Sequence, residues 1–142
     1  SDSAPLCHLT AAMLAAAPSI AVLRDPTRGG VAASLNELAD AAGVGILLDE
    51  AAIPVHPAVQ GVCDILGFDP LTLANEGKLL AFVPPEDTER VLAVMHADPH
   101  GRAACVIGHT TAEEAGTVGL RTSLGGIRVV DLPLGELVPR IC

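Results

Sequence analysis

The stretch IAVLRDPTRGGVAASLNELADAAG, residues 20–43, carries three local signals in uninterrupted order. Its first four residues form a compact apolar run that is typical of a buried strand. A polar turn closed by Gly29 and Gly30 follows, and Gly43 supplies the residue type that commonly ends a helix. Between the glycines, one helical face carries Val31, Leu35, Leu38, Ala39 and Ala42. The stretch therefore predicts a strand, a glycine-containing turn and an amphipathic helix.

The turn itself allows two interpretations. A strand, a glycine-containing turn and a helix can present backbone N–H groups to an anion. Arg24 and Arg28 would add positive charge, and Asp25 could cap the turn or hold a cation or a water molecule. Alternatively, the glycines serve only the tight geometry of an ordinary strand-to-helix turn. The segment lacks the GxxxxGK[ST] pattern, so it is not a Walker loop.

Further elements are predicted on both sides of this stretch from hydrophobic periodicity and turn residues. Helices are expected over 9–17, 58–66 and 85–97; strands over 45–48, 79–83, 103–107, 117–122 and 127–130; and a polar loop over 108–116. This order predicts an α+β fold with a mixed β-sheet flanked by α-helices. We expect a single domain over residues 1–131 and a flexible tail over residues 132–142.

Composition excludes two classes of function. The net charge is −9, Trp and Tyr are absent, and Phe68 and Phe82 are the only aromatic residues. Phosphate-backbone attraction and base stacking are therefore both missing, which argues against nucleic-acid binding. The longest apolar run, residues 9–23, is interrupted by Pro18 and is shorter than the roughly 20 residues of a membrane helix. We expect no membrane association.

The cysteines and histidines do not have the spacing of a metal site. Cys7, Cys63, Cys105 and Cys142 are scattered without a CxxC pair, and the five histidines are isolated. We therefore expect no metal ligands, no disulfide framework and a reducing, cytoplasmic location. The start at Ser1 without Met is expected for a fragment or a processed domain rather than a targeting sequence.

A second motif, Asn75-Glu76-Gly77-Lys78, precedes the apolar run at 79–83. Glu76 and Lys78 would lie at the mouth of that strand, where α/β folds commonly place their chemistry. Glu76 could act as a general base or orient a nucleophile. The alternative is a loop carboxylate that accepts a hydrogen bond from a backbone amide, and the residues alone leave both open.

The chain ends on Pro139-Arg140-Ile141-Cys142, a thiol beside its own carboxylate. Few tertiary contacts hold a terminus, so such a side chain can be carried into an active site. By position alone, the favoured interpretation is an idle residue at a frayed end. A free cysteine is only slightly ionised near neutral pH, and Arg140 would partly offset the neighbouring carboxylate. We therefore expect a partner protein to activate the thiol.

These three motifs, in this order, resemble the C-terminal domain of the HypE family of hydrogenase maturation proteins, within the aminoimidazole ribonucleotide synthetase superfamily. The resemblance runs from about Leu9 to the end, and the terminal tetrapeptide is its most specific part. It implies that Cys142 accepts a carbamoyl group from the carbamoyltransferase HypF. ATP then activates the amide oxygen, and elimination leaves a thiocyanate, with Glu76 deprotonating the nitrogen or supporting that step. The cyano group passes to iron on the HypC–HypD scaffold.

The resemblance also implies what this chain lacks. ATP and Mg²⁺ belong to the full-length protein, whose N-terminal domain builds most of the nucleotide site and the homodimer interface. We expect no cofactor bound to the 142 residues alone, and no turnover. Candidates for the phosphate or tail-docking surface are Arg24, Asp25, Thr27, Arg28, Gly29, Gly30, Asn75, Lys78 and Arg140. The alternatives are a non-catalytic docking module for hydrogenase maturation partners, and an amide-activating synthetase domain of the same superfamily.

Overall fold

The computed structural model describes residues 3–132, and the chain divides into two compact units. Unit 1 comprises Ser1–Asp25 and Asn75–Cys105, and unit 2 comprises Pro26–Ala74 and Val106–Cys142. The chain therefore passes between the units three times along its length. The expected single domain over residues 1–131 stays a prediction. Of the expected tail over 132–142, all residues after Leu132 lie outside the described residues.

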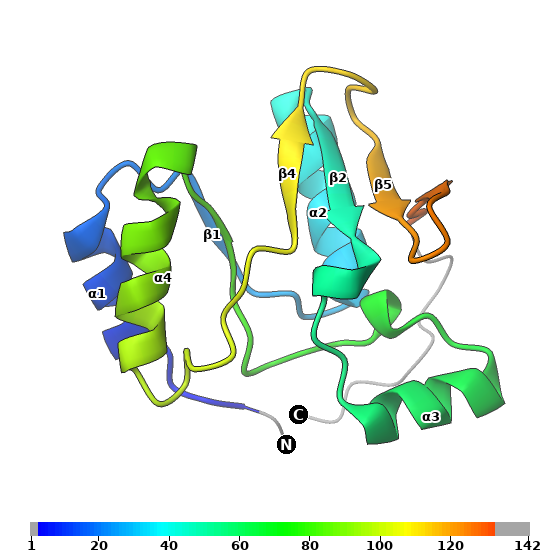
Figure 1. Ribbon diagram of the computed structural model, residues 1–142, viewed down its shortest axis with the longest axis horizontal. Helices are drawn as coiled ribbons and strands as arrows, with labels where there is room; N and C mark the ends of the chain where they lie inside the picture. Colours follow the sequence, from blue (N-terminus) through cyan, green and yellow to red (C-terminus); the bar gives the residue numbers. More distant parts are fainter. Residues whose placement is uncertain (1–2, 133–142) are drawn as a thin grey trace. The chain divides into compact units, whose positions relative to one another are not determined.

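Unit 1 contains two helices and a short antiparallel ladder. The helices are α1, Cys7–Ala16, and α4, Thr88–Ala97, which is preceded by the 3₁₀ turn η3, Pro85–Asp87. They pack against each other, as Figure 1 shows. Strand β1, Val22–Arg24, pairs with β3, Leu80–Phe82. Their antiparallel register places Val22 opposite Phe82 and Arg24 opposite Leu80.

The core of unit 1 follows from the sequence of α1. Leu9 and Met13 are one helical turn apart, so both lie on the same face, and both are buried. They form a cluster with Ala17 and with Val91 of α4. Burying a side chain of this size contributes about 1.5–3 kcal/mol, so this face holds α1 to α4. The helix ends before Pro18, as the sequence predicted.

Unit 2 is built on a four-stranded mixed sheet in the order β4-β2-β5-β6. Strand β2 runs parallel to β5 and antiparallel to β4, and β6 runs antiparallel to β5. The helix α2 contacts β2 and β5 (Figure 1). The bounds are α2, Gly30–Ala42; β2, Gly45–Asp49; β4, Gly108–Thr111; β5, Val118–Arg121; and β6, Ile127–Val129. An α+β fold with a mixed sheet is therefore confirmed.

The segment after β2 forms a helix with little buried surface. This helix, α3, Pro57–Leu66, begins after His56, whose Nδ1 accepts a hydrogen bond from the Ala58 N–H, and it ends at Gly67. Of its side chains, only that of Cys63 is buried. Two 3₁₀ turns flank it: η1, Glu50–Ala52, and η2, Pro70–Thr72. The prediction of a helix over 58–66 is confirmed.

The opening stretch folds as its pattern predicts, with one shift. Gly43 adopts the left-handed conformation at φ 63°, and its N–H bonds back to the carbonyls of the last helical turn. The helix over residues 31–42 is thus confirmed. The strand predicted over 20–23 is observed at Val22–Arg24, so it begins two residues later and ends one residue later. Arg24 is not apolar, yet it belongs to the strand because it pairs with Leu80 of β3. Strand pairing, rather than hydrophobicity, therefore determines where β1 ends.

The predicted strand over 103–107 and the predicted loop over 108–116 are wrong. Residues 103–107 contain no strand, although they are apolar; Val106 is 52% exposed. Strand β4 instead occupies Gly108–Thr111, at the edge of the sheet beside β2. An edge strand tolerates polar side chains, and Gly108 allows a close approach: a Cβ there would lie 2.4 Å from the Leu47 carbonyl oxygen. Backbone pairing, not side-chain hydropathy, determines this strand.

Candidate functional site

The turn after β1 joins the strand to α2 through two left-handed glycines. Pro26 is buried, and the Gly30 N–H donates to the Thr27 carbonyl at 3.0 Å. Gly29 is the residue before the first helical turn, with φ 70°, and Gly30 has φ 61°. Glycine adopts these angles without the strain that a side chain would cause. Local geometry therefore accounts for both glycines in the motif.

Gly30 also lies against the backbone of unit 2. A Cβ atom at Gly30 would come within 2.4 Å of the Leu73 carbonyl oxygen and 2.5 Å of that of Leu71. These carbonyl groups belong to η2 and the residue after it. This side of the turn thus faces electronegative oxygens, which repel an anion. The packing role of Gly30 is therefore established, and phosphate contact by the turn remains a prediction.

We expect Gly30→Ala to destabilise the protein by about 3 kcal/mol, because it adds a left-handed side chain and forces the η2 backbone away. Gly43→Ala is the matched control. Gly43 has nearly the same φ, but a Cβ atom added there would have no other atom within 4 Å. The Gly43→Ala variant should lose only about 1 kcal/mol of the free energy of unfolding. Urea denaturation measures both, and equal losses would contradict the close-approach explanation.

Five further candidates of the two internal motifs, Arg24, Asp25, Asn75, Glu76 and Lys78, lie in unit 1. The β1–β3 register places Arg24 opposite Leu80, so Arg24 and Asp25 lie at the same end of the ladder as the segment before β3. There the Lys78 Nζ donates to the Asn75 Oδ1 at 2.6 Å. Glu76, between them, is half-buried. One end of this ladder therefore gathers two cations, an amide and two carboxylates.

The structure does not bring all candidates into one unit. Arg24, Asp25, Asn75, Glu76 and Lys78 belong to unit 1, whereas Thr27, Arg28, Gly29 and Gly30 belong to unit 2. Cys142 and Arg140 lie outside the described residues. Each internal motif is thus located where the chain passes from one unit to the other.

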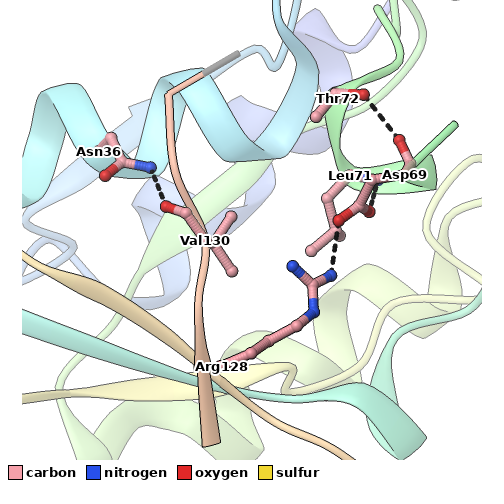
Figure 2. Close-up of polar contacts among 6 residues, drawn as sticks. All are labelled: Asn36, Asp69, Leu71, Thr72, Arg128 and Val130. Atoms are coloured by element: carbon pink, nitrogen blue, oxygen red, sulfur yellow. Dashed lines mark hydrogen bonds and ion pairs between the residues drawn. The ribbon is translucent and has the colours of Figure 1, made fainter.

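Sequence inspection missed a polar network in unit 2, which Figure 2 shows. The Asn36 Nδ2 of α2 donates to the Val130 carbonyl at 2.8 Å and to the Ala32 carbonyl at 2.9 Å. Separately, Arg128 of β6 forms an ion pair with Asp69 at 2.5 Å. An asparagine inside a helix is a weak signal for such a role, because Asn usually favours caps and turns. Nothing in the sequence around Val130 indicates that its carbonyl accepts this hydrogen bond.

A shallow cavity of about 340 Å³ lies beside this ion pair. Its polar lining includes Glu50 and Gln60 together with the Asp69–Arg128 pair. Apolar side chains, among them Phe68 and Leu71, complete its walls. No candidate from the two motifs lines this cavity, so it lies apart from the predicted site.

Glu50, which lines that cavity, accepts a hydrogen bond from the Ser123 N–H in the turn between β5 and β6, at 2.7 Å. This bond lowers the pKa of Glu50 below its usual value of 4.5, because it stabilises the ionised carboxylate. The associated stability is present above pH 4.5 and is lost as the pH falls through the lowered folded-state pKa.

We expect Glu50→Gln to reduce the loss of stability between about pH 7 and pH 3, because the amide keeps the acceptor but does not titrate. Urea unfolding at both pH values measures the effect. Glu113→Gln, which removes another exposed carboxylate of unit 2, is the control. An acid-induced loss in Glu50→Gln as large as in the unmodified protein would contradict the assignment.

Two negative findings apply to residues 3–132. Within that range, no group of three or more His, Cys, Asp or Glu could hold a metal ion. No helix there is both long and apolar enough to cross a membrane.

Comparison with known proteins identifies the family. The model described as "AIR synthase related protein, C-terminal domain" matches residues 3–121. The carbamoyl dehydratase HypE of Rhodobacter capsulatus is 54% identical over 142 residues, which is 100% of this chain and 42% of that protein. The chain therefore spans less than half the length of this relative.

Solved structures agree with that match. A crystal structure of the hydrogenase maturation protein HypE in complex with ATP has a TM-score of 0.92 and 42% identity, covering 100% of this chain and 44% of that one. A HypE–HypF complex gives a TM-score of 0.89 and 40% identity, covering 94% and 43%. The chain thus resembles the C-terminal domain of HypE throughout, and it belongs to the family of AIR synthase related proteins as their C-terminal domain.

Proposed function

We propose that this chain is the substrate-carrying domain of an ATP-dependent carbamoyl dehydratase that acts in the cytoplasm in hydrogenase maturation. One observation carries the proposal: similarity over the whole chain, Cys142 included, to a carbamoyl dehydratase HypE. The likeness to a HypE structure with ATP supports nucleotide use by the complete protein. In this proposal Cys142 is the covalent attachment point of the substrate.

The proposed chemistry consists of two steps. First, the Cys142 sulfur replaces the leaving group of an activated carbamoyl donor, which forms an S–C bond and gives a thiocarbamate. Second, the amide oxygen attacks the γ-phosphorus of ATP and releases ADP. Loss of both nitrogen protons and departure of the oxygen as phosphate then leave S–C≡N. The phosphate is needed because the oxygen of an amide is otherwise a poor leaving group.

Residues at the end of the β1–β3 ladder suit the second step. A general base must remove the nitrogen protons, and we assign that role to Glu76. Arg24 and Lys78 place positive charge at the same end of the ladder, where developing phosphate charge needs compensation. The nearby Asn75 holds the Lys78 ammonium group. We further propose that Arg28 with Gly29, and Arg140 in the terminal segment, contribute to phosphate or tail docking.

We assign the remaining parts of the activity to the protein outside this chain. Mg²⁺ would accompany ATP, and residues 3–132 offer no carboxylate cluster to hold it. The chain covers 42% of its R. capsulatus relative, so the larger remainder would supply metal ligands and the homodimer interface. This chain alone should not turn over.

Two partners follow from the proposal. The carbamoyl donor would be delivered by a HypF-type carbamoyltransferase, which the likeness to HypE in complex with HypF supports. The cyano group would leave to iron on a HypC–HypD scaffold and become a ligand of a [NiFe]-hydrogenase. The thiocyanate carbon is electrophilic towards an electron-rich metal centre, so transfer regenerates the Cys142 thiolate.

Mass spectrometry of the C-terminal peptide tests the proposal in the full-length protein. The protein is incubated with a HypF-type carbamoyltransferase, carbamoyl phosphate and ATP, then freed of nucleotide and of the transferase. We expect one carbamoyl adduct on Cys142, which loses one water when ATP is added back. No adduct would exclude the proposal. Tail-dependent binding without covalent change would instead support a docking module.

A further inference from the structure

The carboxylate of Asp87, in the 3₁₀ turn η3 of unit 1, takes no part in the proposed chemistry. It is the only charged side chain that is buried among residues 3–132. Burying a carboxylate costs free energy unless its oxygens are bonded, and here both are. One accepts from the Ser19 hydroxyl, 68 residues away in the chain, and the other pairs with the Arg90 guanidinium at 2.5 Å. Asp87 therefore joins the start of α4 to the segment between α1 and β1.

The bond between Ser19 and Asp87 lies at one end of the β1–β3 ladder. Ser19 comes shortly before β1, and Asp87 comes shortly after β3. Between this bond and the first strand pair, the Ala21 N–H donates to the Phe82 carbonyl at 2.9 Å. Arg24 and the segment before β3 lie at the opposite end of the ladder. The ladder thus has the Ser19–Asp87 bond at one end and the proposed dehydration chemistry at the other.

Side-chain packing alone specifies the register of this ladder only weakly. Each strand has three residues, and none of them is fully buried. In the observed register, Leu23 pairs with Ala81. A slip of two residues would place Leu23 opposite Leu79 or Val83, and these side chains pack against the same core as Ala81. Because a two-residue slip keeps every side chain on its own face, the apolar pattern does not exclude it.

We infer that Asp87 is a positioning residue: through Ser19 it fixes the β1–β3 register, and so sets where Arg24 lies relative to Glu76. This inference rests on the proposed function, which gives Arg24 and Glu76 their roles. A slip of two residues would carry Arg24 along the ladder by about 7 Å, which is far more than a catalytic arrangement tolerates. Arg90 supports Asp87, because its guanidinium offsets the charge of the buried carboxylate from within α4.

Ser19 is the partner to alter in a test, because it is exposed and its substitution leaves the core intact. Ser19→Ala removes the bond to Asp87 and leaves Arg90 on the carboxylate, whereas Ser19→Thr keeps a hydroxyl. Glu86→Gln is the matched control, because it neutralises an exposed carboxylate in the same turn as Asp87. Each variant is made in the full-length protein and carbamoylated by the transferase. ATP is then added, and thiocyanate formation is measured in a single turnover.

We expect Ser19→Ala to slow this dehydration about tenfold and to leave carbamoylation unchanged. Ser19→Thr and Glu86→Gln should keep the unmodified rate. Hydrogen exchange of the Ala21 amide should be about tenfold faster in Ser19→Ala, because its bond to the Phe82 carbonyl opens more often. Exchange of the Val94 amide, in the middle of α4, should stay unchanged.

A second background separates positioning from a general loss of stability. In Arg24→Gln protein no guanidinium remains to be positioned, so adding Ser19→Ala should not slow dehydration further. The fall in thermal unfolding temperature caused by Ser19→Ala should be the same in both backgrounds, because the bond to Asp87 stabilises the fold whether or not Arg24 is present. A further tenfold loss of rate in the Arg24→Gln background would overturn the action through Arg24.

Two other results would contradict the inference, and one bears on the proposed function instead. Unchanged exchange at Ala21 in the Ser19→Ala variant would show that the bond does not hold the ladder. A dehydration rate as low in Ser19→Thr as in Ser19→Ala would show that the hydroxyl is not the cause. If the unmodified protein formed no carbamoyl adduct, the proposed function would fail, and the exchange measurement would still decide whether Ser19 and Asp87 fix the register.

Discussion

Replacing Cys142 by alanine in the full-length protein is expected to abolish carbamoyl transfer and thiocyanate formation completely. The adduct needs a sulfur at this position, and alanine has none. The measurement is the mass of the C-terminal peptide after incubation with the carbamoyltransferase, carbamoyl phosphate and ATP. ATP consumption that depends on carbamoyl phosphate should fall to the level of the transferase alone.

The chain provides matched controls for this experiment. Cys7 and Cys105 are both exposed, and neither forms a disulfide within residues 3–132, so each offers a thiol elsewhere on the protein. Cys7→Ala and Cys105→Ala should therefore form the adduct at the unmodified rate. An adduct that moved to either cysteine when Cys142 is absent would show that exposure, rather than terminal position, selects the thiol.

The second large effect is expected from Glu76→Gln, which should slow dehydration about 100-fold or more while leaving carbamoylation intact. The amide has the size of the carboxylate but cannot accept the nitrogen proton. Pre-carbamoylated protein is mixed with ATP, and the appearance of the thiocyanate peptide is followed over time.

Stability controls distinguish a catalytic from a structural Glu76. Glu89→Gln neutralises an exposed carboxylate on α4 of the same unit and should leave the rate unchanged. Thermal unfolding of both variants shows whether the fold is retained. If Glu76→Gln dehydrates the adduct at the normal rate, or loses carbamoylation as well, the assigned role is wrong.

The sequence predicted those elements whose side chains decide their structure. Helix α2 shows this, because Leu35 and Ala39 of its predicted apolar face are buried and Gly43 ends it at a left-handed angle. Strand β4 shows the opposite case. Its residues are polar, its position depends on pairing with β2, and the apolar residues before it form no strand. When a strand forms because it pairs with a strand distant in the chain, neither segment needs to show alternating hydrophobicity in its own sequence.

The candidate site was predicted only in part, for a related reason. The glycines of the turn were visible as a motif, but the carbonyl groups that crowd Gly30 come from residues 71 and 73. Likewise, Asn36 became informative only when its amide was found bonded to Val130, in another part of the chain. Motifs indicate which residues matter, whereas three-dimensional contacts show what each one touches.

The threefold passage of the chain between the units has a consequence for folding during synthesis. Strand β1 must wait for β3, since Val22 pairs with Phe82, and β2 must wait for β4 and β5. Neither unit can form its strand pairs while only its first segment has left the ribosome. Because such distant pairings slow folding, the apolar strands remain exposed to aggregation until nearly the whole chain is made.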